Sequence, residues 1–178
     1  KSVQAVIVLP SRELAKQVFE VWRSMATPFH IVAFYGGRPL EQEVASLSGA
    51  NPAVVVGTPG RLLDHLGRSS FAVDKCSLLV IDEFDKCLEL GFQAEMESIM
   101  KQLKFIKQVI FTSATSLNTN EQDDSYLFNK WSNAQILNFL PTSKEEPSQN
   151  TVTWFFTPSP EKRQVRGHLM MARRYGIL

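Results

Sequence analysis

Short apolar segments alternate with amphipathic segments along this chain, and this alternation limits its fold more than any other feature. Val3 to Leu9 is a β-branched, nearly all-apolar run closed by Pro10, as expected of a strand covered on both faces in a parallel sheet. A helix is expected to follow, with Ser11 as its N-cap. One apolar stripe with helical spacing marks its buried face: Leu14, Val18, Val21 and Trp22.

The alternation of strand and helix continues through the first two thirds of the sequence. Further strands are expected at residues 31–34, 53–56, 78–81 and 109–111. Two more apolar faces with helical spacing lie between them: Leu40, Val44 and Leu47, then Phe92, Met96, Ile99, Met100 and Leu103. Such an order predicts an α/β fold in which helices cover both faces of a mostly parallel sheet.

The composition agrees with a single packed core. The chain has 178 residues, of which 44% are hydrophobic and 21% charged, so an ordinary globular domain is expected and a disordered or fibrous chain is excluded. Nineteen basic residues against eighteen acidic ones leave a formal charge of +1. This charge provides no global field that attracts nucleic acid, so any contact with RNA or DNA must be local.

Cysteine usage and hydropathy indicate where the protein works. Cys76 and Cys87 lack a metal-ligand spacing, and two such thiols fit a reducing compartment. The longest apolar run is far shorter than the roughly 20 residues that cross a bilayer, and the chain opens without a charged and apolar leader. We expect an intracellular protein, cytoplasmic or nuclear, with no membrane contact and no obligate oligomer.

The residues that follow the strands carry the candidate chemistry, because ligands of open parallel sheets bind beyond the carboxyl ends of the strands. Gly36 and Gly37 follow the second expected strand. The other four strands end in unusual sequences: Pro10-Ser11-Arg12-Glu13-Leu14-Ala15, Gly57-Thr58-Pro59-Gly60-Arg61, Asp82-Glu83-Phe84-Asp85 and Thr112-Ser113-Ala114-Thr115. We expect these segments to meet at one edge of the sheet.

Two adjacent carboxylates follow the fourth expected strand. This is the arrangement by which phosphate-transferring ATPases hold magnesium and position water. Asp82 is the candidate metal ligand, and Glu83 is the candidate residue that orients the attacking water. Acidic residues at a strand end also cap the next helix and interact favourably with its dipole. The pair alone therefore leaves a catalytic and a structural interpretation open.

The remaining candidates each have a simpler structural explanation when taken singly. Ser113 and Thr115 can be turn residues, because hydroxyls at strand ends often bond to neighbouring backbone groups. Arg12 and Arg61 can be solvated residues at helix starts, although the sequence shows no obvious anion partner for either. The Gly-Gly pair by itself indicates only a turn.

Taken together and in this order, these segments resemble the motif set of the DEAD-box ATP-dependent RNA helicases. The resemblance spans Val3 to Thr115 and extends more loosely to Leu140. It implies a RecA-like three-layer sandwich, with residues 1–140 as a partial first RecA-like domain. Residues 141–150 have the composition of a linker, and 151–178 resemble the beginning of the second RecA-like domain. The later expected elements are strands at 134–140 and 152–156 and a helix at 161–174.

The resemblance also implies roles for individual residues. ATP and Mg²⁺ are the implied cofactors, with Asp82 and Glu83 as catalytic residues and Asp82 as the metal ligand. Three residues would couple the nucleotide state to closure against the second RecA-like domain: Asp85, Ser113 and Thr115. Four would hold the sugar-phosphate backbone of RNA: Arg12, Gly37, Thr58 and Arg61. Such groups contact phosphates without reading bases, so the implied function is ATP-driven, sequence-independent remodelling of RNA duplexes or RNA–protein complexes.

Two departures from the family pattern are minor and one is serious. Phe84 stands where alanine is usual, and Ser11 stands where threonine is common. The chain contains neither a Gly-x-x-x-x-Gly-Lys-Ser/Thr loop nor the family's glutamine-bearing adenine motif, and both are expected upstream of Lys1. Without the loop nothing cradles the phosphates, so this chain alone is expected to be inactive. Without the strand that precedes the loop, residues 109–111 would have an unpaired edge unless another segment covers it.

Two other functions stay open on the sequence alone. A RecA-like module that binds nucleic acid without hydrolysing ATP would use Arg12 and Arg61 on the same scaffold. A DNA helicase relative would also share the fold, because one scaffold serves both polymers. A dinucleotide-dependent oxidoreductase is disfavoured, since no Gly-x-Gly-x-x-Gly follows any expected strand.

Overall fold

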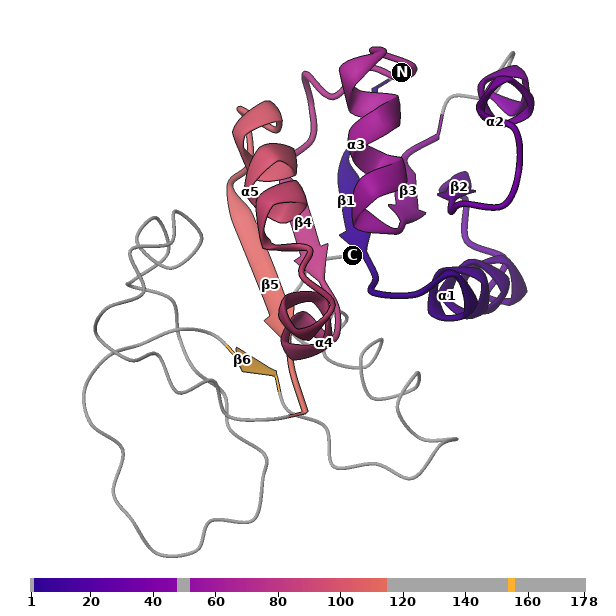
Figure 1. Cartoon of the computed structure of the whole chain (residues 1–178). Helices are drawn as coiled ribbons and strands as arrows, with labels where there is room; N and C mark the ends of the chain where they lie inside the picture. Colours follow the sequence, from indigo (N-terminus) through magenta and orange to yellow (C-terminus); the bar gives the residue numbers. More distant parts are fainter. Residues whose placement is uncertain (1, 48–51, 115–153, 156–178) are drawn as a thin grey trace, which may run out of the picture.

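One parallel sheet of six strands forms the centre of the structure. The computed structural model describes residues 2–47, 52–114 and 154–155. The strand order is β2-β3-β1-β4-β5-β6, and every neighbouring pair is parallel. The strands are β1 (Ala5–Val8), β2 (Ile31–Phe34), β3 (Val54–Gly57), β4 (Leu78–Ile81), β5 (Gln108–Thr112) and β6 (Trp154–Phe155) (Figure 1).

Helices pack on both faces of this sheet. The described helices are α1 (Arg12–Ser24), α2 (Leu40–Ser46), α3 (Pro59–Gly67), α4 (Phe84–Glu89) and α5 (Gln93–Gln102). Alternate residues of β1 enter different core clusters: Val6 and Val8 pack with α3 and α5, whereas Ala5 and Ile7 pack with α1. The predicted α/β sandwich with a parallel sheet is therefore confirmed.

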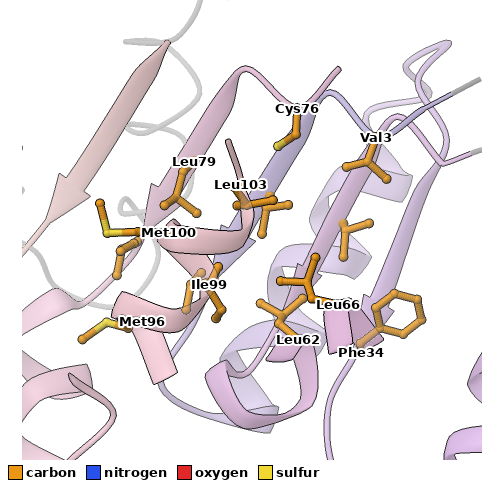
Figure 2. Packing of buried hydrophobic residues seen from close by; sticks show 14 of the residues in the cluster. Val3, Phe34, Leu62, Leu66, Cys76, Leu79, Met96, Ile99, Met100 and Leu103 are labelled. Atoms are coloured by element: carbon orange, nitrogen blue, oxygen red, sulfur yellow. The ribbon is translucent and has the colours of Figure 1, made fainter. Parts of the chain in front are cut away.

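The larger core cluster lies between the sheet and the pair α3 and α5, which run side by side (Figure 1). Figure 2 shows Leu62 and Leu66 of α3, Ile99 of α5 and Leu79 of β4, which belong to this one cluster. The predicted apolar face of residues 92–103 is confirmed at Met96, Ile99, Met100 and Leu103, which are buried, whereas Phe92 is half-buried and precedes the helix. This packing holds α3, the helix that carries Arg61, against the sheet.

The start of α1 follows the predicted capping pattern. Ser11 has extended backbone angles, and its side-chain oxygen accepts a hydrogen bond of 3.1 Å from the backbone N–H of Leu14. An N-cap hydroxyl of this kind satisfies a donor that has no partner inside the helix. The cap fixes Arg12 as the first residue of the helix, immediately after the carboxyl end of β1.

The predicted face of α2 is wrong at one position. Val44 is 39% exposed, whereas Leu40 and Glu43 are buried. The helix turns inward at Leu40, Glu43 and Leu47, because Glu43 forms an ion pair with Arg61 and a hydrogen bond with His65, both of α3. A charged residue thus takes the place that the apolar pattern assigned to valine.

The far edge of β5 is covered by β6. Phe111 pairs with Trp154 and Thr112 with Phe155, both in parallel register. The edge that would be unpaired without a phosphate-loop strand is therefore occupied by a segment from beyond residue 150. Two residues of 151–178 thus join the sheet of the first unit, while the division into 1–140, 141–150 and 151–178 stays a prediction. The elements expected at 134–140 and 161–174, and the linker, lie outside the described residues.

No described helix is suited to span a membrane. None of them combines the length and the apolar character that a bilayer span requires.

We expect Gly57→Ala to destabilise the fold, because a Cβ at this position would lie 2.2 Å from the carbonyl oxygen of Phe34 and 3.0 Å from Cγ of Leu62. That oxygen accepts a hydrogen bond from the backbone of Thr58, so the clash cannot be relieved by a side-chain movement. Overpacking of this kind costs about 1–3 kcal/mol, which a lower midpoint of urea unfolding would report. Gly60→Ala is the matched control, since its Cβ meets nothing within 4 Å. Equal midpoints for the two variants would contradict the expectation.

Candidate functional site

The carboxyl ends of the strands lie along one edge of the sheet, here called the rim. Because all pairs are parallel, the residues that follow β2, β3, β1, β4 and β5 line up in that order. Arginines follow the first three strands of this order and carboxylates follow β4. We call Arg12, Arg38 and Arg61 the basic half of the rim, and Asp82, Glu83 and Asp85 the acidic half. The three named arginines and the three named carboxylates therefore occupy neighbouring stretches of the rim.

The acidic half is organised by hydrogen bonds between β4 and β5. Oδ1 of Asp82 accepts a hydrogen bond from the hydroxyl of Thr112. The backbone N–H of Glu83 lies 3.2 Å from the same oxygen and 3.1 Å from Oγ1 of Thr112. These contacts hold the Asp82 carboxylate in one orientation at the strand end.

Glu83 has a left-handed backbone, with φ 49° and ψ 52°. This conformation is uncommon for a residue other than glycine and costs energy that the surrounding contacts must offset. The bonds from its N–H to Asp82 and Thr112 supply those contacts. The bend carries the chain from β4 into α4, so Glu83 occupies the turn itself rather than the strand or the helix.

Thr112 was not among the predicted site residues. It precedes Ser113 at the end of β5, and β5 pairs with β4 so that Phe111 lies opposite Ile81. That register places Thr112 level with Asp82, because both are the next residue along neighbouring parallel strands. The register of the two strands was the signal that could have identified it.

Two of the predicted coupling residues are buried. Asp85 and Ser113 are each 4% exposed, on α4 and directly after β5. Phe84, fully buried, packs edge-on against Phe111 of β5, with ring centroids 5.0 Å apart. The aromatic residue that replaces the usual alanine therefore packs α4 onto the sheet. Thr115 lies outside the described residues.

Together with burial, the carboxylates of the acidic half raise the pKa of the nearby Cys87 thiol. Burial first, and then the charges of Asp82, Glu83 and Asp85, raise the pKa of Cys87 to about 12. Burial also raises the pKa of Cys76, to about 11, but no carboxylate contributes there. A negative potential next to an ordered carboxylate favours a cation.

The acidic half suits magnesium better than zinc. Among the described residues no three His, Cys, Asp or Glu side chains gather as a metal-binding group. A zinc site needs such a group, whereas Mg²⁺ is commonly held by one or two carboxylates together with water and phosphate oxygens. Asp82, with its orientation fixed by Thr112, fits that smaller requirement.

In the basic half, the structure brings Arg12 and Gly37 together. The Arg12 guanidinium lies so close to the Gly36-Gly37 turn that a Cβ on either glycine would stand 3.1 Å from one of its nitrogens. Gly37 also has a φ of 104°, which side chains disfavour. The turn therefore requires glycine both for its backbone angles and for the approach of Arg12. Arg12 itself is exposed to solvent.

Arg61 has an anion partner, so the expectation that neither arginine has one is wrong for this residue. Its Nε donates a hydrogen bond of 2.7 Å to Oε2 of Glu43, and its Nη2 donates to the carbonyl oxygen of Arg38. Glu43 lies 18 residues earlier on α2, so only the tertiary structure reveals the pair. Thr58, at the N-cap position of α3, makes no capping bond with its side chain.

The matching family profile is described as DEAD/DEAH box helicase and covers residues 1–123. The ATP-dependent RNA helicase CshA of Listeria monocytogenes is 41% identical over 116 residues, which are 64% of this chain and 22% of that protein. The ATP-dependent RNA helicase DeaD of Escherichia coli K12 is 41% identical over 118 residues, which are 65% of this chain and 19% of that protein. This chain spans about a fifth of the length of the curated relatives it matches.

Solved structures share the fold. A DEAD box protein from Methanococcus jannaschii matches 76% of this chain and 39% of its own, with a TM-score of 0.60 and 29% identity. Mss116p bound to single-stranded RNA and AMP-PNP matches 66% of this chain and 26% of its own, with a TM-score of 0.57 and 30% identity. The predicted RecA-like architecture is thereby confirmed.

We expect Asp82→Asn to lower the pKa of Cys87 and to leave the pKa of Cys76 unchanged, because only Cys87 senses the carboxylates. The pH dependence of thiol alkylation measures each pKa, with the other cysteine replaced by alanine. Cys87 should remain above its ordinary value, since burial is the larger cause. Equal shifts of both thiols would contradict a local negative potential.

Because both folded pKa values are raised, the stability that the thiols contribute is present at neutral pH and is lost as the pH rises from 9.0 toward 12.

Proposed function

Because this chain belongs to the DEAD/DEAH box helicase family, we propose that the whole protein is an ATP-dependent RNA helicase and that these residues supply most of its first RecA-like domain. The observation that carries the proposal is the sorting of charge along the rim. One part of the rim offers arginines and a glycine turn to a polyanion, and the neighbouring part offers ordered carboxylates to a metal-bound nucleotide. The two binding functions are therefore adjacent on one sheet edge.

The acidic half would act on ATP. Asp82 would hold magnesium, which when bound neutralises charge on the phosphates. Thr112 would keep the Asp82 carboxylate oriented, because its hydroxyl donates to Oδ1. Glu83 would orient the attacking water, and its fixed backbone turn supports that role, since the side chain starts from a position that two hydrogen bonds define.

The basic half would bind the sugar-phosphate backbone of RNA through Arg12, Gly37, Thr58 and Arg61. Support comes from the exposed Arg12 guanidinium beside the Gly36-Gly37 turn and from the Thr58 hydroxyl, which no capping bond uses. Phosphate contacts of this kind position a strand without reading its sequence. The relative Mss116p, whose structure contains single-stranded RNA and AMP-PNP, shares this fold.

The coupling residues would connect the two halves to a second RecA-like domain of the same protein. Asp85 lies on α4 and Ser113 directly after β5, and both are buried, so a change at the nucleotide would alter their packing. Thr115 belongs to the same proposal. Closure of the two domains around ATP and RNA would then link hydrolysis to remodelling.

ATP hydrolysis is proposed for the whole protein and not for this chain alone. The sequence has no Gly-x-x-x-x-Gly-Lys-Ser/Thr loop, and the acidic half by itself provides no amides that cradle the β and γ phosphates. We also propose a location in the cytoplasm or nucleus, because both cysteines are buried free thiols, as a reducing compartment allows.

In the full-length protein, we expect Glu83→Gln to reduce ATP turnover by several powers of ten while ATP and RNA binding stay nearly intact. The change removes the group that orients water but keeps the metal ligand Asp82. Steady-state ATPase assays with RNA, together with binding titrations, make the measurement. Glu89→Gln is the matched control, because Glu89 lies at the far end of α4, which Glu83 precedes, is exposed and pairs only with Lys86 among the contacts described for it. Near-normal hydrolysis by Glu83→Gln would refute the assignment.

Arg12→Ala in the full-length protein should weaken RNA binding equally for all sequences. If Arg12 contacts one phosphate, the slope of log affinity against log salt should fall by about 0.7 on a single strand. Affinity measured at several salt concentrations gives this slope. Arg23→Ala is the control, since Arg23 is exposed at the opposite end of the same helix. An unaltered affinity and slope for Arg12→Ala would leave Arg12 as a solvated helix-start residue.

A further inference from the structure

A buried ion pair anchors the turn between β2 and α2 to the start of α3. Nη2 of Arg61 donates to the carbonyl oxygen of Arg38, and Nε of the same guanidinium donates to Glu43. The Glu43 side chain is 6% exposed and the Arg61 side chain 15%. Arg61 is thus held between two fixed acceptors, and one of them is the backbone of the turn that carries Gly37.

His65 makes Glu43 a fixed acceptor. Its Nε2 lies 2.9 Å from Oε2 of Glu43, and its fully buried ring stacks on Phe34 with centroids 3.9 Å apart. Nδ1 of His65 has no hydrogen-bond partner in the described part of the chain. The contact with Nε2 of His65 fixes the position of the Glu43 carboxylate, and Arg61 supplies the opposite charge.

This pairing limits what Arg61 can offer to a phosphate. Two of its donor nitrogens are used inside the protein, and a carboxylate 2.7 Å from Nε offsets its charge. Arg61 is also mostly shielded from solvent. A guanidinium in that position is better suited to hold the turn than to attract a polyanion.

Arg38 has the opposite properties. It is exposed, and among the described residues it forms no ion pair with a carboxylate. Its guanidinium lies over the ring of Tyr35, 5.9 Å from the centroid, a contact that keeps the charge and leaves the N–H groups available. It follows β2 at the same rim as Arg12 and Arg61.

We propose that Arg38 is a further phosphate-contacting residue of the basic half, and that Arg61, held by Glu43, positions it. The proposal rests on the proposed RNA-binding function and changes the role of Arg61 within it. Arg61 becomes a positioning residue whose loss disorders the turn of Arg38. If both arginines bound phosphates independently, their effects would add, because each would release its own counterions.

A double-mutant cycle in the full-length protein tests this arrangement. The probe is a fluorescent single-stranded oligouridylate, and its affinity is measured at several salt concentrations for Arg38→Ala, Arg61→Ala and the double variant. We expect Arg38→Ala to lower the salt slope by about 0.7. The double variant should bind no more weakly than the weaker single variant. Additive losses, with a slope reduced by about 1.4 in the double variant, would overturn the positioning role.

Glu43→Gln gives a test in which the two explanations predict opposite signs. If Arg61 contacted phosphate directly, removing the carboxylate charge would unmask it and tighten RNA binding. If Arg61 positions Arg38, loosening its anchor should weaken binding, and the change should have no effect in an Arg38→Ala background. Tighter binding would overturn the proposal. The unfolding midpoint shows whether Glu43→Gln folds. If it does not, the double-mutant cycle of Arg38 and Arg61 still decides whether Arg61 positions Arg38 or binds phosphate itself.

Failure of this inference can be told apart from failure of the proposed function. If the protein is not an RNA helicase, the unsubstituted full-length protein will show no salt-dependent binding of the oligouridylate, and the inference falls with it. If only the inference is wrong, the unsubstituted protein and Arg12→Ala behave as expected, while Arg38→Ala leaves affinity and slope unchanged. Arg68→Ala is the matched control, because Arg68 is exposed at the opposite end of the helix that Arg61 opens.

Discussion

Parallel pairing of β1 with its two neighbours is the constraint on which the rest of the structure depends. Val8 lies opposite Gly57 on one side and opposite Ile81 on the other, so three strands end at the same level. Whatever follows those ends must share one edge, however far apart it is in the sequence. An antiparallel neighbour would have sent its terminal residues to the opposite edge of the sheet. The sorting of arginines and carboxylates is therefore a result of strand order.

Polar groups that are partly shielded from water stabilise the rim, and such groups need partners inside the protein. The two halves provide different partners. In the basic half, Glu43 forms an ion pair with Arg61 and lies within hydrogen-bond distance of Nε2 of His65. Breaking such a buried pair is costly because it leaves an uncompensated charge, so α2 and α3 are held together firmly. In the acidic half, the hydroxyl of Thr112 and the backbone N–H of Glu83 donate hydrogen bonds to Asp82 and orient its carboxylate.

Elements with local signals could be predicted from the sequence, and contacts between distant residues could not. Short apolar runs predicted the strands, and the Ser11 cap predicted the start of α1, because both signals depend on neighbouring residues. The partner of Arg61 depends on how α2 meets α3, and the apolar spacing even pointed to Val44 where Glu43 turns inward. The position of Thr112 beside Asp82 was only partly predictable. It follows from the register of β4 and β5 but not from the strand propensity of either segment alone.

A net charge of +1 gives no overall attraction to a polyanion, so the exposed arginines of the rim must provide the attraction locally. Of the arginines in the basic half, Arg12 and Arg38 are exposed and make no ion pair within the described residues, while Arg61 is paired with Glu43. So few phosphate contacts give a weak and salt-sensitive hold on a single strand. A weak hold by one domain is useful to the proposed motor, because firm binding then requires the second domain. The nucleotide held by the acidic half could control when that second set of contacts forms, and RNA could be released when closure ends.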